Sequence, residues 1–133
     1  RGGQESRGLG DVYKRQGEVL VAPGGPHLVF REGRLVLEDT PPVMNIRPCV
    51  DYLFLSAAEQ FGKRLIGLIM TGMGRDGARG CQEIVARGGY TIAQDEESSV
   101  IYGMARVAAA RTGISMVLPV HRISDHLREL VCS

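Results

Sequence analysis

The sequence has no excess of charge of one sign and no long apolar run. Its 16 basic and 15 acidic residues are mixed along the chain and leave a formal net charge of +1. Nucleic acids and anionic membranes are bound through clustered positive charge, so we expect neither as a partner. The longest apolar runs, at residues 65–70 and 116–118, are far shorter than the roughly 20 residues that cross a bilayer. No basic and then apolar leader opens the chain. We therefore expect a cytoplasmic protein without membrane insertion.

Cysteine is scarce. Cys49, Cys81 and Cys132 are odd in number, widely spaced and outside any CxxC arrangement. This pattern disfavours a disulfide framework or a zinc site and predicts reduced, structural thiols. Only Cys81, just after a glycine loop, is placed to act as a nucleophile, and it would need basic, partly exposed surroundings. A structural thiol is the favoured interpretation.

Several catalytic and binding motifs are also missing. No serine lies in a GxSxG turn, and the loop TGMGRDG at residues 71–77 has neither a Walker lysine nor GxGxxG spacing. The acidic turn at residues 95–97 lacks the alternating ligands of a calcium loop. The histidines stand alone and are interpreted as surface or packing residues: His27, His121 and His126. We expect no metal and no cofactor, and no Ser-His-Asp set can be assembled by motif.

The most informative stretch that is present runs from Leu65 to Gly80. Its near-continuous apolar opening is typical of a parallel strand buried on both faces, and the glycines that follow predict a tight loop leading into a helix. Asp76 would then lie at the carboxyl end of a strand, where open α/β sheets place their sites.

Two interpretations of Asp76 remain open at this point. A carboxylate at a helix start can orient an imidazole, but Asp is also among the best N-cap residues and could accept bonds from the amides near Ala78 and Arg79. Met73 lies in the same loop, and its backbone amide could face a site.

The remaining segments predict an α/β fold. Three β-rich runs, at Val19–Ala22, His27–Arg31 and Arg34–Glu38, should pair as strands of an antiparallel hairpin region. Residues 50–61 have the apolar spacing of an amphipathic helix that stops at Gly62. A helix from near Asp76 to Gly88 is expected next.

The last third of the chain predicts a second βα unit. It comprises a strand at residues 90–93 and a stretch at 100–112 that contains an alanine-rich helical segment. A strand at 114–119 and a terminal helix with Ile123, Leu127, Leu130 and Val131 on one face follow. We expect a doubly wound, mostly parallel sheet with helices on both faces. Arg1–Gln16 shows no periodicity and is predicted to be a disordered tail or a non-native junction.

Four segments together resemble a known family. They are APGGPHL at 22–28, RPCVDYLFLSAA at 47–58, TGMGRDGARG at 71–80 and TIAQDEESSVIYGMA at 91–105. They are similar to the catalytic domain of the bacterial chemotaxis protein-glutamate methylesterases, and the similarity covers nearly everything from Gly17 onward.

The resemblance implies hydrolysis of γ-glutamyl methyl esters on methyl-accepting chemotaxis receptors, and in many members deamidation of receptor glutamines. A phosphorylatable receiver domain normally regulates such proteins. Within the family's Ser-His-Asp triad, Asp76 corresponds to the acid, and the backbone amide of Met73 corresponds to a donor that helps to hold the oxyanion.

The sequence also departs from the family. The family's nucleophilic serine and catalytic histidine belong upstream of Gly17, and neither motif is present; His27 matches a different position, and Ala105 replaces a usual proline. We therefore expect residues 17–133 to be the C-terminal portion of a methylesterase domain, without the receiver domain and inactive alone. The alternative is a non-enzymatic module that docks on receptors or on a receiver partner.

Overall fold

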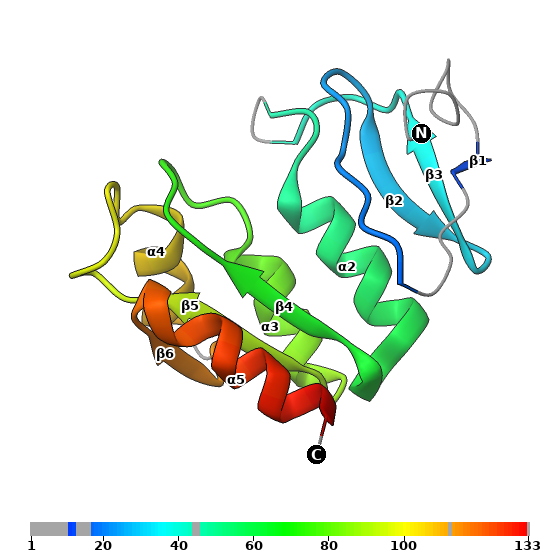
Figure 1. Cartoon of the computed structure of the whole chain (residues 1–133). Coiled ribbons are helices and arrows are strands. Elements are labelled where there is room, and N and C mark those ends of the chain that lie inside the picture. The colour runs from blue at the N-terminus through cyan, green and yellow to red at the C-terminus, as the bar shows by residue number, and fades with distance from the viewer. Residues whose placement is uncertain (1–10, 13–16, 44–45, 112, 133) are drawn as a thin grey trace.

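The backbone forms two sheets with helices between and around them (Figure 1). The computed structural model describes residues 11–12, 17–43, 46–111 and 113–132. One sheet is antiparallel with the strand order β1-β3-β2, and the other is parallel with the order β4-β5-β6. Helix α2 (Val50–Phe61) lies between them. The predicted α/β fold with an antiparallel hairpin near its start is confirmed.

The hairpin joins β2 (His27–Arg31) to β3 (Arg34–Glu38). Its turn residues Glu32 and Gly33 have φ values of 51° and 80°, the left-handed pair that matches the twist of a two-residue hairpin. The prediction of a strand at Val19–Ala22 is wrong. The side chains of this segment alternate between buried and exposed, but its backbone does not pair with a neighbouring strand. Leu20 and Ala22 pack against the hairpin core, whereas Val19 and Val21 are 90% and 87% exposed.

The free edge of β3 is occupied instead by β1 (Asp11–Val12). Two residues of the segment that we predicted to be a disordered tail or a non-native junction are therefore paired with the hairpin. A two-residue ladder is too short to produce a periodic signal in the sequence. The rest of the predicted tail, residues 1–10 and 13–16, lies outside the described residues.

Helix α2 confirms the predicted bounds and its stop. Ala57 and Ala58 are buried, and Gly62 caps the helix with φ 55° before a short 3-10 turn, η1 (Gly62–Arg64). The Ser56 hydroxyl accepts a hydrogen bond of 2.9 Å from the Phe30 amide, which ties the helix to the hairpin sheet. The small buried alanines let neighbouring elements approach the helix closely.

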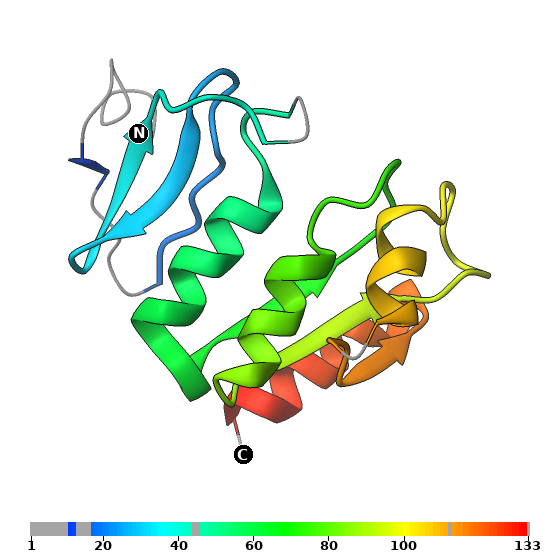
Figure 2. The same cartoon turned by 180° about the vertical axis from the view of Figure 1, so that it is seen from behind.

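The parallel sheet consists of β4 (Ile66–Ile69), β5 (Tyr90–Gln94) and β6 (Met116–Leu118). Helices α3 (Ala78–Ala86) and α4 (Met104–Ala110) cover one face, and α5 (Val120–Cys132) covers the other, as Figure 2 shows from behind. Helices on both faces confirm the doubly wound architecture. On α5, Ile123 is buried, but Val131 is 69% exposed and does not belong to the packed face.

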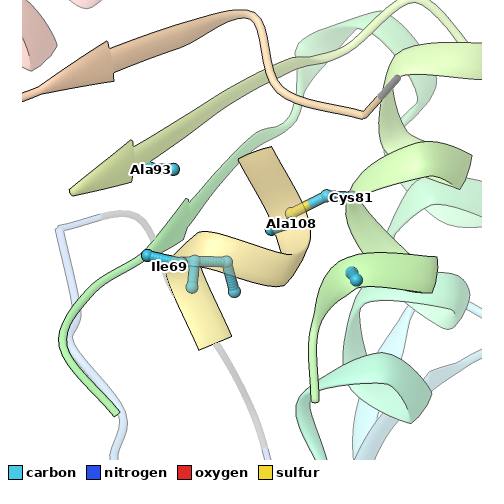
Figure 3. Packing of buried hydrophobic residues seen from close by; sticks show 6 residues of the cluster. Ile69, Cys81, Ala93 and Ala108 are labelled. Atoms are coloured by element: carbon cyan, nitrogen blue, oxygen red, sulfur yellow. The ribbon is translucent and has the colours of Figure 1, made fainter. Parts of the chain in front are cut away.

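The core of this unit lies between the sheet and the pair α3 and α4 (Figure 3). Ile69 from β4 and Ala93 from β5 pack against Cys81 and Ala108. Small side chains on both helices bring the helices close to the sheet, so the ends of the strands and the starts of the helices are held firmly. Within the described ranges, no helix combines the length and apolarity that a membrane span requires.

Candidate active site

The loop between β4 and α3 is held against a second loop at the same edge of the sheet. The Gly72 amide donates to the Ile101 carbonyl at 3.0 Å, and the Gly72 carbonyl accepts from Gly103 and Met104 at 3.1 and 2.9 Å. The Thr71 amide donates to the Gln94 side chain at 2.9 Å. Helix α4 (Met104–Ala110) lies within the stretch predicted to contain a helical segment, and it begins at Met104 because the preceding residues pair with the glycine loop.

Gly77 is the position where this loop requires glycine. Its φ is 104°, and a Cβ there would lie 2.5 Å from Cδ1 of Ile69. Any other residue would combine an unfavourable left-handed backbone with a clash against the core. Gly77 thus lets the chain pass tightly from the end of β4 into α3, with Asp76 directly before it.

Asp76 is buried, with only 6% of its surface exposed. Its Oδ2 accepts from the Val50 amide at 2.6 Å, and its Oδ1 accepts from the Asp51 amide at 2.9 Å. Asp76 therefore caps the N-terminus of α2. The predicted partners of this cap were the amides near Ala78 and Arg79, and that part of the prediction is wrong. The N-cap residue of α3 is Gly77, which makes no side-chain hydrogen bond, and Asp76 bonds to the amides of α2 instead.

Asp51 performs the reciprocal role. Its Oδ1 accepts from the Gly77 amide at 3.1 Å and from the Gly80 amide at 2.7 Å, and only 5% of the residue is exposed. The acid on α2 thus caps α3, and the acid before α3 caps α2. Sequence reasoning missed Asp51; the available signal was an acidic residue in the first turn of a predicted helix.

Met73 lies in the same loop, three positions before Asp76. Its side chain is 76% exposed. Among the described residues, no acceptor takes a hydrogen bond from its backbone amide. A free amide on an exposed loop is available to an external acceptor such as an oxyanion.

None of the histidines is hydrogen-bonded to Asp76. His27 is buried on the hairpin, with Nε2 3.1 Å from the Pro41 carbonyl and its ring edge-on to Tyr52 at 4.7 Å. His126 pairs with the Tyr90 hydroxyl at 2.9 Å. The exposed His121 lies on α5, on the other face of the sheet from α3. The described residues thus place an acid without an imidazole beside it.

The two buried cysteines are poor nucleophiles. Burial raises the pKa of the Cys81 thiol to about 12, and the nearby Asp51 charge adds to that shift. Burial likewise raises the pKa of Cys49, whose sulfur accepts a hydrogen bond from the Tyr52 amide. Because thiolates are the reactive form, these residues are structural, as their spacing predicted.

The acidic turn after β5 is arranged around its own serine. Asp95 accepts from the Ser98 amide at 3.0 Å and from the Ser98 hydroxyl at 2.7 Å, and these bonds lower the pKa of its carboxyl. Its carboxylate is thus used to close the turn. In the part of the chain that the structure describes, no group of three or more His, Cys, Asp or Glu side chains could hold a metal ion.

With this geometry in view, similarity to known proteins identifies the family. The family model described as CheB methylesterase matches residues 10–127. The chain belongs to the CheB methylesterase family. The resemblance seen in the sequence motifs is thereby confirmed, and the matched range contains both the Asp76 loop and its partner helix α2.

Relatives of this CheB-family chain carry names of the same activity. A protein-glutamate methylesterase/protein-glutamine glutaminase 2 of Anaeromyxobacter dehalogenans is 53% identical over 116 residues, which cover 87% of this chain and 34% of the relative. The protein-glutamate methylesterase FrzG of Myxococcus xanthus is 52% identical over 122 residues, which cover 91% of this chain and 36% of FrzG. The chain therefore spans about a third of the length of these curated relatives.

A solved structure supports the fold as well. The CheB methylesterase catalytic domain of Thermotoga maritima matches with a TM-score of 0.78 and 36% identity, covering 83% of this chain and 60% of that one. The parallel sheet, the hairpin and the helices described above are thus part of a CheB catalytic-domain fold.

Proposed function

We propose that this chain supplies the acid and part of the oxyanion region for a Ser-His-Asp hydrolysis of glutamate methyl esters on proteins. The observation that carries the proposal is the buried Asp76 carboxylate, fixed by two amides at the carboxyl end of β4. Family membership and the names of the relatives support the reaction class. Deamidation of protein glutamines belongs to the same proposal, since both reactions are acyl transfers to water.

Asp76 would act by holding the ring of a catalytic histidine. Each carboxylate oxygen carries two lone pairs, and the amides of Val50 and Asp51 use one on each oxygen, which leaves acceptor capacity for an imidazole N–H. The amides prevent the carboxylate from rotating. A fixed acceptor selects one histidine tautomer and stabilises the imidazolium that forms when the serine is deprotonated.

The Met73 amide would act on the other side of the reacting carbonyl. Attack of serine on an ester or amide carbon places negative charge on the carbonyl oxygen, and a preorganised N–H stabilises that charge. The free amide of Met73 is in the same loop as Asp76, which is consistent with donor and acid serving one site. Its side chain has no part in this role.

The serine and the histidine are the missing members of this set. We propose that a segment outside these 133 residues supplies the serine and the histidine. The 133-residue chain by itself would then be inactive. Residues 17–133 would form the C-terminal portion of the catalytic domain. The substrates would be methyl-accepting chemotaxis receptors in the cytoplasm, with control by a receiver domain of the same protein. The family and the relatives, which are named for catalysis, give no support to a docking module.

Methanol release tests the proposal. The chain is incubated with methylated receptor, alone and together with a polypeptide that carries the family's serine and histidine motifs. We expect release only from the mixture, and a loss on the order of 10⁴-fold in Asp76→Asn, as for a triad acid. Asp125→Asn, an exposed acid on α5, is the matched control. Methanol release by the chain alone would refute its inactivity, and full activity of Asp76→Asn in the mixture would refute the triad role.

A further inference from the structure

A small cavity at the start of α3 is lined by three arginines. It has a volume of about 150 Å³ and is bordered by Arg75, Arg79 and Arg111, together with Asp51 and Ala78. The arginines come from separate segments: the glycine loop, the first turn of α3 and the residue after α4. This volume holds a carboxylate group and several waters, since one water needs only about 10–15 Å³ on such a measure.

The guanidinium groups at this cavity are available for a ligand. Arg75 and Arg79 are exposed and make no ion pair or hydrogen bond with any described residue. Arg111 donates to the side chain of Gln82 at 3.3 Å, which fixes its direction without neutralising its charge. All three are therefore unpaired cations around one opening.

The only acid among the lining residues, Asp51, offsets one of the three positive charges. Asp51 is buried, and its Oδ1 accepts the amides of Gly77 and Gly80. One of its two oxygens is thus directed to the N-terminus of α3, whose dipole is itself positive. The cavity keeps an excess of positive charge, and its walls favour an anion.

We propose that this cavity binds a carboxylate side chain of an acidic polypeptide, namely a residue next to the reacting glutamate in the protein substrate. This assignment rests on the proposed function. The cavity adjoins the site, because Arg75 precedes Asp76 directly and the Asp51 amide donates to Asp76. Planar guanidinium groups match carboxylates in a two-bond geometry, which makes arginine the suitable residue for such recognition. The chain would thereby select ester groups that lie in acidic surroundings.

Titration with peptides tests the assignment without any turnover. A tetraglutamate peptide and a tetraglutamine peptide are added to the labelled chain, and the backbone amide signals of residues 75–80 and 111 are followed by NMR. We expect only tetraglutamate to shift them, with an affinity that falls as salt is added. Arg75→Gln and Arg79→Gln should each weaken binding about threefold, and together about tenfold.

The matched control is Arg122→Gln, an exposed arginine on α5, on the opposite face of the sheet. Its affinity for tetraglutamate should equal that of the parent chain. Equal weakening in Arg122→Gln and Arg75→Gln would overturn the proposal, because it would reduce the effect to overall charge. Sodium sulfate that shifts the same signals with the same affinity would also overturn it and indicate a general anion site.

The result is separable from that of the methanol assay. If tetraglutamate binds as expected and the mixture releases no methanol, the proposed reaction fails while the acidic-peptide site stands. If methanol is released and the two peptides bind alike, the cavity assignment fails alone.

Discussion

Asp51 and Asp76 each cap the helix that begins beside the other. Asp76 accepts the first two amides of α2, and Asp51 accepts Gly77 and Gly80 at the start of α3. Both acids are buried, and each carboxylate satisfies amides at a helix start that have no partner within their own helix. The proposed catalytic acid is therefore part of the contact that fixes α2 against α3. Its orientation depends on a residue 25 positions earlier in the chain.

Asp51→Ala should destabilise the fold by about 1–3 kcal/mol, because the buried amides of Gly77 and Gly80 lose their acceptor. Asp51→Asn should cost clearly less. In Asp51 a single oxygen, Oδ1, accepts both hydrogen bonds, and the carbonyl oxygen of asparagine can take its place and accept both. The free energy of unfolding in urea measures the difference. Asp125→Ala, at an exposed acid, is the control, with an expected effect within about 0.5 kcal/mol. Equal losses for Asn and Ala at position 51 would contradict the capping role.

Asp76→Asn should be more damaging than Asp51→Asn. Asp76 uses both carboxylate oxygens, so asparagine would place an NH₂ group against one of the two amide donors. A lost bond and a buried, unsatisfied donor together cost about 1–3 kcal/mol. The same urea titration ranks the two variants, and the reverse order would show that the two carboxylates are not held as described. Activity of Asp76→Asn should be measured below its melting temperature.

The elements with local signals were predictable. The helix at Val50–Phe61 has an apolar stripe and a glycine stop, and the hairpin has a two-residue turn with glycine, so neither depends on distant residues. The strand, glycine loop and helix from Leu65 to Gly80 were predictable for the same reason. In the structure the strand and helix are β4 and α3.

The features that the sequence did not predict depend on contacts between residues far apart in the chain. Asp51 has its partner amides 26 and 29 residues away, so no spacing rule could connect them. The sequence did not give the start of the helix within residues 100–112, because Ile101 and Gly103 bond to Gly72 and the helix begins after them. Val19–Ala22 alternates as a strand does, but its alternation reflects the packing of Leu20 and Ala22 against the hairpin core and not a place in the ladder.

Gly77→Ala and Gly74→Ala separate backbone strain from packing in the site loop. Both glycines have positive φ, 104° and 92°, so each alanine should cost about 1–2 kcal/mol for the left-handed backbone. A Cβ at Gly74 meets nothing within 4 Å, whereas one at Gly77 would lie 2.5 Å from Ile69. Gly77→Ala should therefore lose a further 1–3 kcal/mol, roughly the cost of overpacking a core. Equal losses in thermal or urea unfolding would contradict the close packing of Gly77 on β4.

Cys81 should make the fold less stable at high pH. Its pKa is about 12 in the folded chain, because the thiol is buried and close to the Asp51 charge, against 9.0 for an ordinary thiol. Between these values the unfolded chain releases the proton and the folded chain keeps it. The stabilisation is thus complete below about pH 9 and is lost as the pH rises toward 12, at about 1.4 kcal/mol per pH unit.

The slope of the unfolding free energy against pH measures this effect. Cys81→Ala should reduce the slope, because the packing lost with the side chain lowers the free energy of unfolding equally at every pH. Cys132→Ala is the control, because that thiol is exposed and its removal should leave the slope unchanged. At pH 8 a thiol reagent should modify Cys132 and spare Cys81 until the chain unfolds, since the buried thiol is both protonated and inaccessible. If the parent chain and Cys81→Ala gave the same slope, or if Cys81 reacted as fast as Cys132, the thiol would not be enclosed between β4, α3 and α4. The same result would contradict the close packing that we describe between the Asp76 loop, the sheet and α3.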